Sequence, residues 1–217
     1  MNDHSFFRWL LLFAIFAGFQ QPLFGLIKCS PTDTLSPELQ SWVQLYDSGW
    51  KGDDQALQAF FETAALHEQE WRHSPLLRAI YGSACIARAR LVPNLQKPRW
   101  LRSGAEHLNA AVKAAPEAVA PRLLRAVSFA VLPRRAGEIE TVRADFNLLV
   151  KAAERNDLAE NCRQKIFYHA GAFALRDRDP RALTLLRLAA ELDPEEGLER
   201  ARLKRILRSA ENLFEEK

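Results

Sequence analysis

Apolar residues recur along most of the chain at the three-to-four-residue spacing of amphipathic helices. The clearest case is the segment 180–194, PRALTLLRLAAELDP. Both of its ends are marked, because Asp179 can cap the first turn and Pro194 cannot continue the helix. No segment shows the strict apolar–polar alternation of a half-buried strand, so the pattern predicts an all-α protein.

The same spacing predicts about nine helices after an apolar N-terminal segment. Cap-plus-proline starts at Ser36-Pro37 and Ser74-Pro75 mark two of them. The breaks between helices are short, and the longest in the body is VPNLQKP. The expected helices cover approximately 37–50, 54–71, 75–91, 99–115, 121–132, 139–154, 158–175, 180–192 and 194–214.

A small–large–small pattern followed by a proline occurs twice at the same offsets. The two copies are Gly104, Leu108, Ala111 and Pro116, and Ala182, Leu186, Ala189 and Pro194. They lie 78 residues apart, and a looser copy near Arg143 falls midway between them. Helix pairs with such a period indicate an α-solenoid, because each pair must bury its apolar face against a neighbour.

These residues resemble the tetratricopeptide repeat (TPR) family, whose helix–turn–helix unit of about 34 residues carries small residues in both helices and ends at a proline. The Leu-Gly step in the first helix of that unit is similar to Tyr81-Gly82 and Ala170-Gly171. The resemblance covers roughly residues 38–194, although the period here is longer than in the family. It implies a protein-binding scaffold, because the family has no common chemistry.

Residues 1–28 are expected to be separate from a single TPR-like domain over 29–217. Arg8 is followed by eleven apolar residues, WLLLFAIFAGF, which match the n- and h-regions of a secretory signal. This run is shorter than the roughly 20 residues that span a bilayer, although extension to Ile27 reaches that length. We expect a cleaved signal peptide or a membrane anchor over 9–27, with a buried apolar helix as the alternative. Either of the first two places the body outside the cytoplasm, in a periplasmic or extracellular location.

The chain contains three cysteines, Cys29, Cys85 and Cys162, which form neither a CxxC pair nor a zinc-binding spacing. The odd number leaves at least one thiol free or bonded to another chain. Cys85 lies within the apolar helix segment YGSACIARA, and we expect it to be a buried structural thiol.

Charge is distributed in blocks, although the net charge of the chain is only +3. Residues 38–71 carry seven acids and one base, whereas residues 72–135 carry twelve bases and two acids. Residues 136–217 are nearly balanced. Such asymmetry indicates the nature of a partner rather than the fold.

The candidate partner-binding residues are arginines of this basic block and one tryptophan among them. Arginine forks suit carboxylates and phosphates, and tryptophan is favoured at interface hot spots. The set is Arg88, Arg90, Arg99, Trp100, Arg102, Arg122, Arg125, Arg134 and Arg135. The alternative is that the arginines form internal ion pairs and solvated faces, with Trp100 in the core. The expected partner is a protein or peptide, for example an acidic one, or an anionic membrane surface. No nucleic-acid recognition motif is present.

The sequence contains no recognisable catalytic motif, cofactor motif or metal site. There is no GxSxG serine and no glycine loop after a strand, and His67 and His73 are too far apart for one helix face. We therefore predict a non-enzymatic, exported or membrane-anchored protein-binding scaffold without a cofactor. The alternatives are a membrane-associated assembly factor that docks on anionic surfaces through 72–135 and, more remotely, a hydrolase with a site assembled across the groove.

Overall fold

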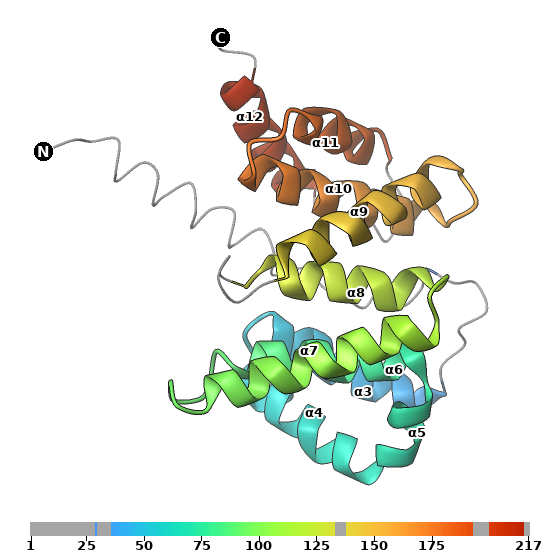
Figure 1. The fold of residues 1–217 in the computed structure, drawn as a ribbon, viewed down its shortest axis with the longest axis vertical. Coiled ribbons are helices and arrows are strands. Elements are labelled where there is room, and N and C mark those ends of the chain that lie inside the picture. The colour runs from blue at the N-terminus through green and yellow to red at the C-terminus, as the bar shows by residue number, and fades with distance from the viewer. Residues whose placement is uncertain (1–28, 30–35, 133–137, 193–199, 215–217) are drawn as a thin grey trace, which may run out of the picture. The chain divides into compact units, whose positions relative to one another are not determined.

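The computed structural model describes residues 29, 36–132, 138–192 and 200–214, and all regular structure in these ranges is α-helical (Figure 1). The prediction of an all-α protein is therefore confirmed. The expected signal or anchor and the Asp193-Pro194 start of the last helix lie outside the described residues. The helices are α3 (Pro37–Trp50), α4 (Asp54–Leu66), α5 (Glu68–His73), α6 (Pro75–Arg88), α7 (Lys97–Ala114), α8 (Val119–Ala130), α9 (Ile139–Glu154), α10 (Glu160–Arg176), α11 (Arg181–Glu191) and α12 (Arg200–Phe214).

Two of the helix starts use the caps that the sequence predicted. The Ser36 side chain accepts a hydrogen bond from the Leu39 amide at 3.3 Å, at the start of α3. Ser74 does the same for the Leu77 amide at 3.3 Å, at the start of α6. Each hydroxyl satisfies an amide of the first turn, which has no partner within its own helix.

The single helix expected over 54–71 is wrong, because the structure has two helices there. α4 ends at Leu66, and α5 begins after His67, whose φ of −113° and ψ of 32° interrupt the helix. The indole of Trp71 donates to the Ala64 carbonyl across this break at 3.0 Å. The bend therefore buries an aromatic side chain through a tertiary contact, and no glycine or proline marks it in the sequence.

The described helices belong to two compact units, one ending at Leu149 and one beginning at Val150. We call them the N-terminal unit and the C-terminal unit. In the N-terminal unit α3 packs against α4, α6 packs against α7, and α8 contacts both α6 and α7. In the C-terminal unit α10 packs against α11, and α11 packs against α12. Nothing in the hydrophobic pattern indicated this division within 29–217.

In three helix pairs a glycine allows the two helices to approach closely. A Cβ on Gly82 of α6 would lie 2.9 Å from the Gly104 carbonyl oxygen of α7. One on Gly49 of α3 would lie 2.7 Å from the Leu57 Cβ of α4, and one on Gly171 of α10 would lie 2.8 Å from the Leu186 side chain of α11. The absence of a side chain therefore sets the distance between the helices in each pair.

Three helices, α7, α9 and α11, share one frame of inward-facing positions, with offsets of four and then three residues. Both copies that the sequence identified, in α7 and α11, are buried. The looser copy expected near Arg143 corresponds to the buried face of α9, which begins at Val142. In α4 the buried residues are instead Leu57, Phe60 and Ala64, with offsets of three and then four residues. The three matching sets are Gly104, Leu108 and Ala111; Val142, Phe146 and Leu149; and Ala182, Leu186 and Ala189, all of which are buried.

Within the C-terminal unit, a polar side chain of α10 caps the C-terminal end of α11. The Gln164 amide nitrogen donates to the carbonyl of Ala189 at 3.2 Å and to that of Leu192 at 2.6 Å. These carbonyls belong to the last turn, where intrahelical donors run out. The α10 helix is also buried over most of its circumference, and burial lowers the pKa of its His169 to about 3.

The described helices include none that is both long enough and apolar enough to cross a membrane. Cys29 and Cys162 are disulfide-bonded, whereas Cys85 has a free, fully buried thiol. The interpretation of Cys85 as a buried structural thiol is confirmed. Burial raises the pKa of this thiol to about 12, which keeps it protonated and unreactive.

Alkylation should distinguish the three cysteines. In the folded, oxidised protein no cysteine should react quickly at about pH 8, because Cys85 is buried and protonated. Denaturation without a reductant should allow one alkylation, and added reductant should allow all three. Mass spectrometry counts the added groups. Three alkylations before reduction would contradict the disulfide at Cys29 and Cys162.

Candidate binding surface

Five aromatic rings from four helices form a continuous strip on the N-terminal unit, which we call the aromatic strip. Trp71 of α5 and Tyr81 of α6 stack face to face, with ring centroids 4.0 Å apart. His107 of α7 packs edge-on against Trp71 at 5.3 Å and against Tyr81 at 5.1 Å. Phe61 of α4 continues the strip, at 5.6 Å from Tyr81 and 5.1 Å from Trp100 of α7.

The aromatic strip is partly open to solvent. Trp71 is buried, but Phe61, Tyr81, Trp100 and His107 are half-buried. Aromatic rings in this state retain apolar area that a partner can cover, and they lose little conformational freedom when they bind. Their packing against one another holds the open edges in place before any partner arrives. The strip is therefore a preformed apolar contact surface.

Two arginines add positive charge at the end of the strip that contains Trp71 and His107. The Arg72 guanidinium lies 4.9 Å from the Trp71 ring centroid and also pairs with Glu68. Burial, followed by the charges of Arg78 and Arg72, lowers the pKa of His107, so that its imidazole is neutral near pH 7.

Two buried polar atoms in this region lack a hydrogen-bond partner among the described residues, His107 Nδ1 and Arg78 Nε. Buried polar atoms are nearly always paired, with protein groups or with ordered water. Both atoms are shielded from solvent, and Arg78 is close enough to His107 to lower the pKa of its imidazole. The neutral imidazole can either donate or accept a hydrogen bond, whereas Arg78 can only donate. The pair therefore suits an acceptor such as a carboxylate.

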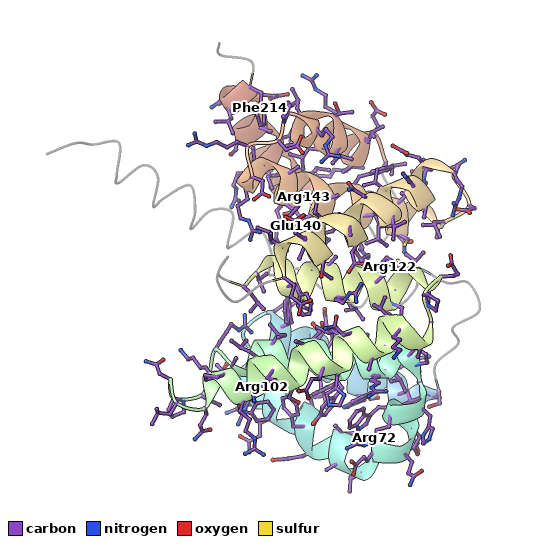
Figure 2. The ribbon with its side chains drawn as sticks, in the orientation of Figure 1. Arg72, Arg102, Arg122, Glu140, Arg143 and Phe214 are labelled. Carbon is purple, nitrogen blue, oxygen red and sulfur yellow. The ribbon has the colours of Figure 1, made fainter. Side chains whose placement is uncertain are left out.

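Among the arginines predicted from the sequence, Arg99 and Arg102 are exposed on the first turns of α7, beside Trp100. Figure 2 shows Arg102 on α7 and Arg72 on α5, at different positions on the N-terminal unit. Trp100 is neither a fully exposed anchor nor a core residue. It is half-buried and packs against Phe61.

The other members of the predicted set are placed differently. Arg88 is half-buried in the last turn of α6. Arg90 donates to the carbonyl of Gly49 at 3.2 Å and to that of Trp50 at 3.4 Å, so it satisfies the C-terminal end of α3. Arg134 and Arg135 lie outside the described residues.

Arg122 and Arg125 are engaged in an internal ion pair rather than presented to a partner. Arg125 of α8 holds Asp145 of α9 through two hydrogen bonds of 2.8 Å, and Arg122 adds a third of 2.9 Å. The Asp145 side chain is only 2% exposed. Arg125 also donates to Asn109 at 3.0 Å, and Arg122 donates to the Pro116 carbonyl. For these two residues the alternative interpretation, internal pairing, matches the structure.

Sequence reasoning missed Trp71, Tyr81 and His107 as members of one surface, because they come from three helices. The feature of the sequence that points to this region is its charge, because residues 71–105 contain seven bases and no acid.

The imidazole of His67 lies 3.6 Å from the carboxylate of Glu70. No group of three potential metal ligands occurs in the part of the chain that the structure describes.

The fold and this surface define an all-α protein built of packed helix pairs, with an aromatic and arginine-rich face. Comparisons with protein-family models, curated proteins and solved structures found no significant match to the chain.

Proposed function

We propose that this protein is a non-enzymatic scaffold that binds an acidic segment of a partner protein along the aromatic strip. The observation that carries the proposal is the half-buried strip itself, with Arg72 against Trp71 and with two buried polar atoms, on His107 and Arg78, that have no partner among the described residues. Aromatic edges supply apolar contact area, and guanidinium forks bind carboxylates through paired hydrogen bonds. A peptide with acidic and apolar side chains matches both features.

The repeated frame of the helix pairs supports a scaffold of the TPR type. Three helices use the same inward-facing offsets, and Gly82 and Gly171 lie where the Leu-Gly step of that family is expected in the first helix. We propose that α3/α4, α6/α7, α8/α9 and α10/α11 are copies of one helix–turn–helix unit. Repeats of this kind serve mainly as binding surfaces, which is consistent with a non-enzymatic role.

We also propose that the protein acts outside the cytoplasm, delivered or anchored through its apolar segment at 9–27. The disulfide at Cys29 and Cys162 supports this location, because disulfides persist mainly in oxidising compartments. The buried free thiol of Cys85 would be unaffected by such an environment.

A photocrosslinking amino acid in place of Glu106 tests the proposed binding surface. Glu106 is exposed on α7 and precedes His107, so the probe would lie beside the strip without removing one of its rings. In intact cells we expect a discrete crosslinked product with a partner protein. The same probe in place of Lys204, which is exposed on α12, is the matched control and should give none. Equal crosslinking at the two positions would contradict the proposal.

Once the crosslinked segment is known, Trp100→Ala should weaken its binding about 30-fold, the cost of roughly 2 kcal/mol typical of an interface hot spot. Arg78→Ala should also weaken binding, because it removes the donor beside His107. Titration of the labelled peptide into each variant measures the dissociation constants. The double variant Lys204→Glu/Arg208→Glu should leave the affinity unchanged. Unaltered binding by both Trp100→Ala and Arg78→Ala would exclude the aromatic strip as the site.

A further inference from the structure

The loop between α6 and α7 exposes two large apolar side chains. Leu95 is 96% exposed, and Leu91 is 37% exposed. Isolated surface leucines are common, but these two lie in one short connection that a packed helix pair holds in place. The close approach of Gly82 and Gly104 fixes that pair. The loop therefore presents an exposed apolar tip at the end of a closely packed helix pair.

Positive charge surrounds this tip. Arg88 lies in the last turn of α6, while Lys97, Arg99 and Arg102 lie in the first turns of α7. Because α6 and α7 are packed neighbours joined by this loop, both sets lie at the loop end of the pair (Figure 1). Arg102 is five residues after the start of α7, about 8 Å along the helix axis. Arg90 is not counted, since it is bound to α3.

We propose that the α6–α7 loop docks on an anionic lipid surface. Leu95 and Leu91 would enter the boundary between headgroups and acyl chains, and the four basic side chains would bind lipid phosphates. The charge complementarity is carried by the four basic side chains, which lie within a stretch, 71–105, that contains no acid. Exposed leucines beside basic side chains match an anionic bilayer, in which an acyl region lies beneath the phosphates. The proposed docking surface adjoins the aromatic strip at Trp100, but the proposal does not rest on the proposed function.

Leu66 provides a matched comparison within the same unit. It is 82% exposed, at the end of α4, but its neighbours Glu62, Glu68 and Glu70 are acidic. Exposed apolar area alone would make both leucines dock on lipid. Docking that depends on basic neighbours would involve Leu95 and exclude Leu66, since acids are repelled by an anionic surface.

An environment-sensitive fluorophore attached through Leu95→Cys tests the proposal on the full chain. Selective labelling is feasible, because Cys85 is buried and the other two cysteines are disulfide-bonded. Vesicles that contain phosphatidylglycerol should shift the emission to the blue and raise it several-fold, whereas pure phosphatidylcholine vesicles should not. The response should disappear at about 0.5 M salt, where the Debye length is about 4 Å. The same label attached through Leu66→Cys should not respond.

Arg99→Glu/Arg102→Glu should reduce the affinity of the labelled chain for anionic vesicles about tenfold or more, and Lys204→Glu/Arg208→Glu should not. Arg78→Ala, which weakens peptide binding in the proposed function, should leave the lipid response intact. Because the fluorophore reports the loop itself, membrane attachment through residues 9–27 does not produce the signal. The proposal is overturned if the label responds equally to neutral vesicles, responds equally at position 66, or responds only to an added protein.

Discussion

Replacing Asp145 with alanine is expected to lower the free energy of unfolding of the N-terminal unit by about 3–5 kcal/mol. The carboxylate is almost fully buried and receives three hydrogen bonds from Arg122 and Arg125, whose side chains are about 15% and 14% exposed. Its removal leaves two poorly solvated guanidinium groups without their counterion. The loss should therefore greatly exceed the contribution of an ordinary surface ion pair. Urea unfolding followed by circular dichroism measures it.

The control for this experiment lies on the same helix. Glu140 and Arg143 of α9 form a 2.7 Å ion pair, but their side chains are 78% and 42% exposed (Figure 2). Glu140→Ala should change stability by less than about 1 kcal/mol, because solvent screens exposed pairs. The double variant Arg122→Leu/Asp145→Leu should recover part of the stability that Asp145→Ala loses. Similar effects of Asp145→Ala and Glu140→Ala on the free energy of unfolding would show that the buried cluster contributes no more to stability than an exposed ion pair.

Adding side chains at Gly104 is expected to separate α6 from α7. A Cβ there would lie 2.7 Å from the Gly82 carbonyl oxygen and 2.8 Å from Ile86 Cδ1. Alanine favours the helix over glycine by about 1 kcal/mol, so the steric cost equals the net loss of stability plus this gain. Since backbone atoms cannot move aside as flexible side chains can, we expect a net loss of about 1–2 kcal/mol for Gly104→Ala and about 3 kcal/mol or more for Gly104→Val.

The matched control is Lys113, which is exposed on the same helix. Lys113→Ala and Lys113→Val should differ by only about 0.6 kcal/mol, the difference in helix propensity between the two residues. Chemical denaturation of all four variants gives the comparison. If Gly104→Ala stabilises the protein by the propensity difference alone, the helices are free to adjust and the close approach is unimportant.

The parts of the fold that were predictable depend on local interactions. Caps such as Ser36 and Ser74 act within one turn, and the spacing of apolar residues reports the buried face of a single helix. The copy near Arg143 could be placed only approximately, because a loose match does not distinguish adjacent registers. The break at His67 was not predictable, since the indole bond from Trp71 to Ala64 forms only when the two helices meet.

The candidate site also has one part that the sequence predicted and another that it did not. Sequence could identify the basic block and its arginines, because composition is visible without coordinates. It could not separate Arg122, which faces the buried Asp145, from Arg102, which faces solvent, because the difference depends on a neighbour 23 residues away. It also could not assemble Trp71, Tyr81 and His107 into one strip.

The amino-acid sequence by itself therefore determined the all-α class, the approximate positions of the helices apart from the break at His67, and the repeated small–large–small frame of 104–111 and 182–189. These features follow from interactions among residues within one helix. Only the tertiary structure decided which cationic side chains are neutralised and which aromatic rings remain open. Those outcomes depend on contacts between helices distant in sequence, and a side chain's partner determines whether its charge is available to bind anything else.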